Sequence, residues 1–411
     1  MKEDFISKFR SERNESTPPP PPPSSLQQRI KQVQKVYDSI ELMVRQAYGL
    51  HASDIHIRVG EVPRLRLRGN VVFFPKTETI TQKMFDSYLQ EILTTSQQEQ
   101  FAKTKEIDTA ILYPGFVRCR INCFQSLNGG AIVLRLISLH VPSIESLGLP
   151  GILKELITKK QGLILVTGAT GSGKSTTQAA MINHLNQTAQ KHIVTIEDPI
   201  EYVHTSQQSL ISQREVGLHT HEFHQALRSV LREDPDVIMI GEMRDRSTIE
   251  TALAAAQTGH LVIGTLHTRN ALGTINRLLS IYTPDEQATM RVQILDSLVA
   301  VIAQILLPTT DASRTVAMEL LINTPAMQDY LMKEEESEAL QLMETSIDQG
   351  MQVMNHALCE LMLSGRITID TATGASNDPS DLRRRARNQG LDPSRSTKRE
   401  RSFKNYDYSP R

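Results

Sequence analysis

Residues 162–177 read GLILVTGATGSGKSTT, and this stretch decides the fold of the chain. Its apolar start, Leu163 to Val166, is typical of a strand that is buried on both faces of a parallel sheet. The glycine-rich turn that follows allows backbone N–H groups to surround a phosphate, and a helix-compatible run from Thr176 to Leu185 comes next. A strand, a glycine-rich loop and a helix in this order predict a phosphate loop that binds a nucleoside triphosphate.

One continuous segment supplies the predicted phosphate contacts. Lys174 is placed to reach the β- and γ-phosphates, and the Ser175 hydroxyl is placed to ligate Mg²⁺. The other predicted nucleotide contacts are Gly168, Ala169, Thr170, Gly171, Ser172, Gly173 and Thr176. A chance match in a flexible glycine loop is the alternative, and the flanking strand and helix argue against it.

Length and composition limit the class of protein. A length of 411 residues favours two domains with extensions, and 45 basic against 46 acidic residues indicate no particular partner. Three cysteines, Cys119, Cys123 and Cys359, form no CxxC pair and no disulfide framework, which favours a reducing compartment. The N-terminus is polar and no apolar run of about 18 residues exists, so we expect a soluble, cytoplasmic protein.

Composition and periodicity divide the chain into five parts. They are a disordered Pro-rich extension (1–28), an N-terminal α+β domain (29–140), a linker (141–151), an α/β nucleotide-binding domain with C-terminal helices (152–372) and a disordered basic tail (373–411). The proline run Pro18–Pro23 is predicted to be extended, either as a spacer or as a ligand for an aromatic groove.

Periodicity also predicts the elements within both domains. The N-terminal domain is expected to hold a helix at 26–48 stopped by Gly49, strands at 54–59, 65–68 and 117–124, and helices at 82–93 and 96–103. The second domain is expected to hold parallel strands at 163–167, 193–196, 237–240 and 261–265 with helices between them. A short strand at 315–322 and helices through Leu363 follow.

Acidic residues follow two of the predicted strands. Glu197 and Glu201 come directly after the strand that ends at Ile196, and ligands bind beyond the carboxyl ends of parallel strands. These acids therefore fall near the nucleotide, although solvated or capping acids are a common alternative. Glu242 ends the apolar strand 237–240 and is the candidate to polarise the attacking water.

Histidines form two further groups. His260 and His267 flank the strand 261–265, where they are either structural or sensors of the γ-phosphate. His219, His221 and His224 have a spacing that suggests a metal site, but no further ligand cluster supports it and we expect none there.

Four long motifs in this order closely resemble the secretion-ATPase superfamily, with the type IV pilus retraction ATPases as the nearest branch. The motifs are GATGSGKSTT, TIEDPIEYVH, ALRSVLREDPDVIMIGEMRD and TGHLVIGTLHT, and the likeness runs from about Ala47 to Ala372. The resemblance implies a hexameric ring in which a PAS-like N-terminal domain is joined to a RecA-like ATPase domain. It also implies ATP and Mg²⁺ as ligands.

The resemblance assigns roles to single residues. Lys174 and Ser175 match phosphate and Mg²⁺ ligands, and Glu242 matches the catalytic acid. Glu197 and Glu201 match the acidic box, and His260 and His267 match the histidine box. Arg118, Arg120 and Arg135 match N-terminal arginines that reach the γ-phosphate, whereas a solvated strand face is the alternative.

The resemblance leaves three functions open. The first is a motor for pilus retraction and twitching motility, bound to an inner-membrane platform protein at the pilus base. The second is a related secretion or conjugation motor, and the third is an accessory or regulatory paralogue of the main motor. A CxxC zinc module is missing, which favours the retraction branch. However, residues 326–331 read AMQDYL where retraction motors resemble AIRNLI, so that Gln328 replaces an arginine.

The C-terminal segment is rich in basic residues. These residues are Arg383, Arg384, Arg385, Arg387, Arg395, Lys398, Arg399, Arg401, Lys404 and Arg411. They serve solubility, or they attract the chain to an anionic membrane surface. We expect no nucleic-acid partner, because the body of the protein is not basic.

Overall fold

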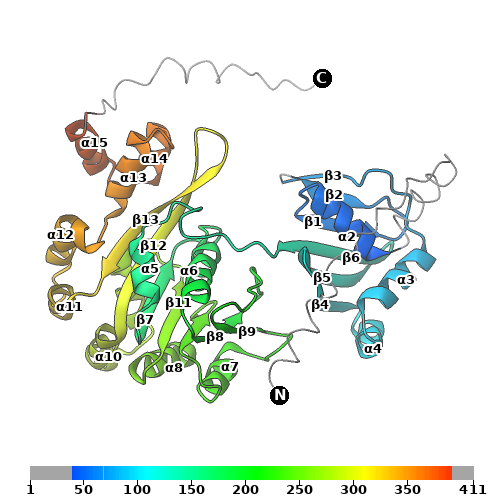
Figure 1. Cartoon of the computed structure of the whole chain (residues 1–411), viewed down its shortest axis with the longest axis horizontal. Coiled ribbons are helices and arrows are strands. Elements are labelled where there is room, and N and C mark those ends of the chain that lie inside the picture. The colour runs from blue at the N-terminus through cyan, green and yellow to red at the C-terminus, as the bar shows by residue number, and fades with distance from the viewer. Residues whose placement is uncertain (1–38, 68, 391–411) are drawn as a thin grey trace, which may run out of the picture. The chain divides into compact units, whose positions relative to one another are not determined.

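The computed structural model describes residues 39–67 and 69–390, and the chain divides between Leu136 and Ile137 into two compact units (Figure 1). The predicted Pro-rich extension lies outside the described residues. So does the part of the predicted 26–48 helix that precedes Ser39. The described helix α2 (Ile40–Gly49) is capped by Ser39, whose backbone is extended and whose side chain accepts a hydrogen bond from the Leu42 N–H. The extended Ser39 therefore interrupts the predicted continuous helix, and its described part is α2.

The N-terminal unit is a six-stranded sheet with helices packed against it. The strand order is β3-β2-β1-β6-β5-β4. The strands are β1 (Asp54–Arg58), β2 (Arg64–Leu67), β3 (Asn70–Phe73), β4 (Glu106–Tyr113), β5 (Val117–Ser126) and β6 (Gly129–Ser138). The further helices are α3 (Gln82–Ile92) and α4 (Thr95–Thr104). Period-two patterns predicted β1, β2 and β5, but β3, β4 and β6 were missed.

Alternation along these strands sends one set of side chains into a core. Ile55, Ile57 and Leu134 are fully buried in one cluster with residues of α2, α3 and α4. Successive side chains of a strand point to opposite faces. The other face of the sheet therefore carries the intervening polar residues, which include Arg120 and Arg135.

The second unit is built on a seven-stranded sheet of order β13-β12-β7-β11-β10-β8-β9. All neighbouring strands are parallel except β13, which runs antiparallel to β12. The strands are β7 (Gly162–Thr167), β8 (His192–Glu197), β9 (Leu210–Glu215), β10 (Val237–Ile240), β11 (Leu261–Leu266), β12 (Leu298–Pro308) and β13 (Arg314–Ile322). The predicted α/β class and its four central strands are confirmed, whereas β9 and β12 were not predicted.

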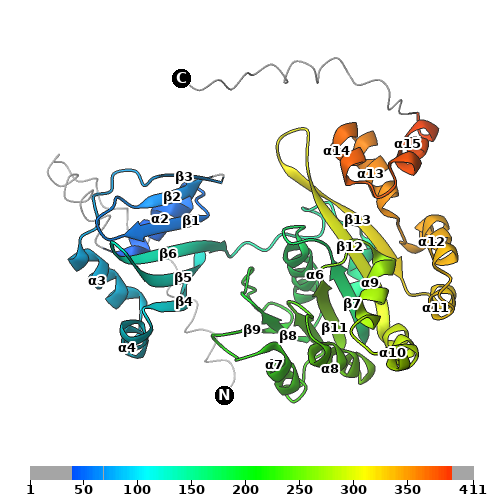
Figure 2. The ribbon, with the colours of Figure 1, turned by 180° about the vertical axis from the view of Figure 1, so that it is seen from behind.

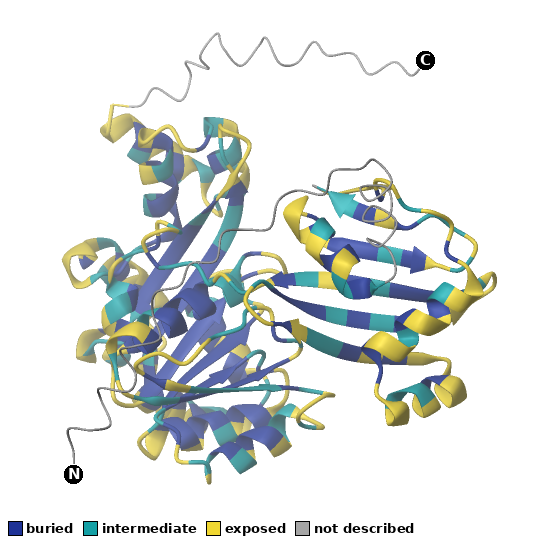
Figure 3. Cartoon of the chain, turned by 45° about the vertical axis from the view of Figure 1, so that its right-hand side comes forward, coloured by how far each residue is buried: buried dark blue, intermediate teal, exposed yellow. Residues whose placement is uncertain are grey.

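Helices cover both faces of this sheet. One core holds side chains of α5 (Ile152–Ile157) and α6 (Lys174–Thr188), and the other holds side chains of α7 (Phe223–Val230), α8 (Arg246–Gln257), α9 (Ala271–Leu279) and α10 (Pro284–Ser297). Helix α6 lies in front of the sheet in Figure 1, and α9 lies in front of it in Figure 2. The strands between them are buried along most of their length (Figure 3). Within residues 39–67 and 69–390, no helix combines the length and apolar character needed to cross a bilayer.

The C-terminal helices extend beyond the predicted end of the domain. They are α11 (Pro325–Met332), α12 (Glu336–Thr345), α13 (Met354–Leu363), α14 (Ile369–Ala375) and α15 (Pro379–Asn388). The prediction that the chain is disordered from residue 373 is therefore wrong for the residues up to the end of α15. Leu382 and Ala386, four residues apart, are buried against α13, and Arg385 pairs with both Asp381 and Glu344. The surrounding charges concealed this narrow apolar stripe in the sequence.

Replacing Leu382 with Ala is expected to loosen this helical cluster. The side chain is 1% exposed, and a buried Leu→Ala change costs about 2–5 kcal/mol. Hydrogen exchange of the α13–α15 amides should therefore accelerate. Leu363→Ala, at a side chain that is 45% exposed, is the control and should change exchange little. Equal exchange in both variants would contradict the packing of α15.

Candidate nucleotide-binding site

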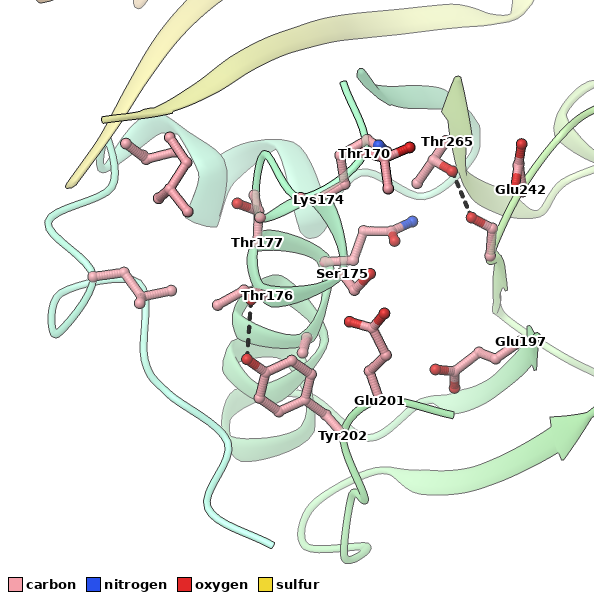
Figure 4. A pocket seen from close by; sticks show the side chains of 18 of the residues that line it. Thr170, Lys174, Ser175, Thr176, Thr177, Glu197, Glu201, Tyr202, Glu242 and Thr265 are labelled. Carbon is pink, nitrogen blue, oxygen red and sulfur yellow. Dashed lines mark hydrogen bonds between the residues drawn. The ribbon is translucent and has the colours of Figure 1, made fainter. Parts of the chain in front are cut away.

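The predicted phosphate loop opens onto a cavity at the carboxyl ends of adjacent strands. The cavity measures about 870 Å³ and is lined from the loop after β7, the segment after β8 and the residues that follow β10 and β11. Because β7, β11, β10 and β8 are neighbours in the sheet, their carboxyl ends meet along one edge. Figure 4 shows Lys174, Ser175, Glu201 and Glu242 around this space.

The backbone of the loop has the geometry that a phosphate cradle requires. Gly168, Gly171 and Gly173 have φ values of +146°, +80° and +89°, and α6 begins directly afterwards at Lys174. The Lys174 ammonium donates to the carbonyl oxygens of Gly168, at 2.8 Å, and Ala169, at 3.1 Å. The helix N-terminus and this cation together favour a bound anion.

Two glycines of the loop are expected to respond differently to substitution by alanine. A Cβ at Gly168 would lie 2.4 Å from the Gln304 carbonyl oxygen and 2.5 Å from Ser172 Oγ, whereas a Cβ at Gly171 has no neighbour within 4 Å. Overpacking of about 1–3 kcal/mol should weaken nucleotide binding by Gly168→Ala about 10- to 100-fold. Gly171→Ala adds only backbone strain, so its effect should be smaller. Titration with a fluorescent ATP analogue measures both, and equal affinities would refute this account of the loop.

The two predicted acids of the first cluster both line the cavity but have different surroundings. Glu197 is buried, and one of its oxygens accepts hydrogen bonds from Thr195 Oγ1 at 2.6 Å and Gln213 Nε2 at 3.0 Å. Burial raises the pKa of Glu197 to about 7, although these hydrogen bonds lower it. Glu201 is exposed, and in Figure 4 its carboxylate points toward the side of the cavity that carries Ser175.

Glu242 belongs to a row of polar side chains in contact with one another along the cavity wall. Its Oε1 is 2.8 Å from His267 Nε2, and its Oε2 accepts from Arg244 Nη2 at 2.5 Å. The other ring nitrogen of His267 is 3.4 Å from Lys174 Nζ. A proton on Nε2 of His267 lets that nitrogen donate to the Glu242 carboxylate.

The pKa values of two groups in this row are shifted. Partial burial raises the pKa of Glu242, but the hydrogen bonds and charges of Arg244 and His267 outweigh it, so the pKa lies below its usual value. Partial burial lowers the pKa of Lys174, and the carboxylates of Glu242 and Glu201 counteract that effect. At neutral pH, Glu242 is therefore a carboxylate that can accept a proton.

His260 does not join this group. It precedes β11, whereas His267 follows it, so the strand separates the two residues by its full length. The Nδ1 of His260 lies 3.0 Å from the carbonyl oxygen of Ala255, at the end of the sheet opposite the cavity. Of the two histidines, His267 lines the nucleotide cavity and His260 does not, and a structural or a sensor role for His260 stays a prediction. Because a strand is extended, two residues that flank it in the sequence lie at its opposite ends.

Other lining residues escaped the sequence analysis. Tyr202, next to Glu201, bonds Thr176 Oγ1 through its hydroxyl at 2.9 Å, and its position in the motif could have revealed it. The remaining set comes from segments far apart in the chain and has no local signal. It includes Ser146, Leu147, Leu149, Leu306, Arg314, Val316 and Arg366.

The three predicted arginines belong to the N-terminal unit. Arg118 and Arg120 lie on β5 and Arg135 lies on β6. Arg118 is 7% exposed, whereas the side chain of Arg135 is 66% exposed and its Nε donates to Asp54 Oδ1 at 2.9 Å. Arg135 is thus the arginine of this set with the most accessible charge.

The described residues contain no group of three or more His, Cys, Asp or Glu side chains arranged to hold a metal ion. His219 Nδ1 accepts from the Glu215 N–H at 3.0 Å, and His224 pairs with Glu222 at 3.1 Å. In the nucleotide cavity, the Ser175 hydroxyl and the carboxylate of Glu201 provide the hard oxygen ligands that suit Mg²⁺ when phosphate oxygens complete its shell.

Comparison with known proteins is consistent with this architecture. Residues 29–390 match the family described as type II/IV secretion system protein. The chain belongs to this family. It is 40% identical over 333 residues to the type IV pilus retraction ATPase PilT of Pseudomonas aeruginosa, which covers 80% of this chain and 96% of PilT. The type IV pilus ATPase PilU of the same organism is also 40% identical, over 80% of this chain and 87% of PilU.

Solved structures show the same fold. The crystal structure of the pilus retraction motor PilT with bound ADP has a TM-score of 0.78 at 40% identity, covering 84% of this chain and 99% of that one. The ATPase DotB of Legionella pneumophila has a TM-score of 0.67 at 30% identity, covering 81% and 94%. Membership of this ATPase family, together with the phosphate loop, makes the chain a nucleotide-binding protein.

Proposed function

We propose that this protein hydrolyses ATP as a homohexameric motor and drives the retraction of type IV pili. The observation that carries the proposal is the meeting of Lys174, Glu242 and His267 in one cavity at the phosphate loop. The similarity to PilT over nearly the whole length of that protein supports the same role.

Each side chain has a defined task in the proposed reaction. The loop N–H groups and Lys174 bind the β- and γ-phosphates, and Glu242 orients a water and accepts its proton as it attacks the γ-phosphate. Ser175, with Glu201, would hold Mg²⁺, which neutralises phosphate charge when bound. His267 senses the γ-phosphate through its contact with Glu242. Arg118, Arg120 and Arg135 supply positive charge to the γ-phosphate when the ring closes.

A second candidate is an accessory motor that assists the main retraction ATPase. PilU is as similar to this chain as PilT is, at 40% identity. Where retraction motors carry an arginine, Gln328 instead donates to Asp296 Oδ1 at 2.8 Å. A neutral amide in place of a cation changes the surface of α11.

A deletion strain and the purified protein test these proposals. Loss of the gene should give hyperpiliated cells without twitching motility, and the purified protein should hydrolyse ATP. A partial motility defect that the main motor compensates would favour the accessory role. A secretion defect with normal twitching would favour an export motor. Absence of ATP turnover by the purified ring would refute the motor function.

The proposed role places the protein at the cytoplasmic face of the inner membrane, where it would act on the platform protein at the pilus base. The basic residues after Gly390 are proposed to add attraction to anionic lipids of about 1 kcal/mol each near the surface. Truncation after Gly390, which keeps α15, should preserve ATP hydrolysis and reduce salt-sensitive sedimentation with anionic liposomes. Equal sedimentation at low salt would leave these residues without a role in membrane binding.

A further inference from the structure

The loop after β10 brings a second charged side chain to the candidate catalytic acid. Met243 is 1% exposed, whereas the side chains of Glu242 and Arg244 are 19% and 72% exposed. Arg244 Nη2 then lies 2.5 Å from Glu242 Oε2. None of the family motifs gave Arg244 a role of its own.

The backbone around Glu242 is fixed on both sides. The Gly241 N–H donates to the Ile196 carbonyl on β8 at 2.7 Å, and the Met243 N–H donates to the Thr265 carbonyl on β11 at 3.1 Å. The remaining freedom of Glu242 is therefore that of its side chain. Contacts to its two oxygens from His267 and Arg244 decide where the carboxylate points.

The other charged groups of the cavity do not take the place of Arg244. Lys174 reaches the carboxylate only through His267 and is otherwise bonded to carbonyl oxygens of the phosphate loop. Asp198 and Glu201, in the segment after β8, are acids and cannot donate to a carboxylate. His267 occupies the opposite oxygen. Among the arginines and lysines of residues 39–67 and 69–390, Arg244 is thus the one paired with Glu242.

We propose that Arg244 is a positioning residue that holds the Glu242 carboxylate in its productive orientation and keeps it ionised. This inference rests on the proposed ATP hydrolysis and adds a residue to its machinery. Each carboxylate oxygen has two lone-pair directions, so a hydrogen bond from Arg244 leaves a direction for the attacking water. Orientation of a catalytic base by another polar group is a general feature of such sites.

Three substitutions separate orientation from charge. Arg244→Ala removes both and should lower kcat about tenfold, with KM for ATP nearly unchanged, since its ion pair is with Glu242, which is proposed to act on the water and not on the phosphates. It should also shift the acidic limb of the kcat–pH profile to higher pH, because the pKa of Glu242 rises when the cation is lost. Arg244→Gln keeps a donor and should recover most of the plateau rate with the limb still shifted. Arg244→Lys keeps the charge and should return the limb to its wild-type position.

Arg246→Ala is the matched control. Arg246 lies two residues further on and pairs with Glu250 and Glu286, both at 2.7 Å, away from the cavity lining. Its removal should leave the acidic limb where it is. All proteins are full-length, and nucleotide affinity is measured beside kcat to confirm an intact phosphate loop.

Three results would overturn the assignment. If Arg244→Ala turns over ATP at the wild-type rate with an unshifted acidic limb, the contact with Glu242 has no catalytic consequence. A loss near a thousandfold in all three substitutions, with no shift of the limb, would assign Arg244 to the transferred phosphate instead. A wild-type protein without turnover would remove the proposed function and this inference together, whereas the first two results leave the proposed function standing.

Discussion

Replacing Glu242 with Gln is expected to lower ATP hydrolysis by about two to four orders of magnitude while ATP still binds. The amide has nearly the same shape as the carboxylate but accepts no proton from the attacking water. The segment that carries it is held to β8 and β11 by backbone hydrogen bonds at Gly241 and Met243, so the fold should not change. Single-turnover hydrolysis and nucleotide titration on the purified protein separate the two effects.

Two further variants serve as comparisons for Glu242→Gln. Lys174→Ala should weaken nucleotide binding itself, because Lys174 belongs to the phosphate loop. Glu250→Gln changes an acid on the neighbouring helix α8 that pairs with Arg246 outside the cavity, and it should turn over normally. Near-normal turnover in Glu242→Gln would show that a group other than Glu242 accepts the proton of the attacking water.

Arg135→Ala is expected to reduce kcat about a thousandfold, the usual effect of removing an arginine that reaches a transferring phosphate. The side chain is 66% exposed, so its charge is available for delivery when a ring closes. Asp54, its partner, keeps a hydrogen bond from Ser53 Oγ at 2.8 Å and an ion pair with Arg66 at 3.7 Å. The N-terminal unit should therefore stay folded, and nucleotide affinity should be nearly unchanged.

Arg58→Ala is the control for this prediction. Arg58 lies on β1 of the same sheet, where it pairs with Glu61, and no phosphate-binding role is proposed for it. A kcat loss below tenfold in Arg135→Ala would show that this arginine does not act on the phosphate. Sedimentation with ATP should also show a hexamer, and a strict monomer would contradict delivery within a ring.

The strongest sequence predictions concerned short segments with a local physical signal. The apolar run before Gly168 and the glycines after it predicted β7, the phosphate loop and α6 together. Glu197 and Glu242 were located near the nucleotide because parallel strands align their carboxyl ends along one edge. Both side chains line the cavity.

Elements without such a signal were missed or assigned wrongly. Strand β12 is an apolar run whose length fits a strand or a helix equally, and its pairing with β7 and β13 decided the outcome. Helix α15 was expected to be disordered because its two buried residues stand among arginines and aspartates. Tertiary contacts to α13 and Glu344 gave those residues a place in the core.

The sequence by itself determined the class of the fold, the phosphate loop and the acids at the strand ends, because each depends on neighbours within a few residues. Only the tertiary structure decided that His267 contacts Glu242, while His260 lies at the other end of β11. It also decided that Arg244 contacts Glu242. These facts depend on side-chain direction and on which strands are adjacent, and packing of the whole sheet sets both.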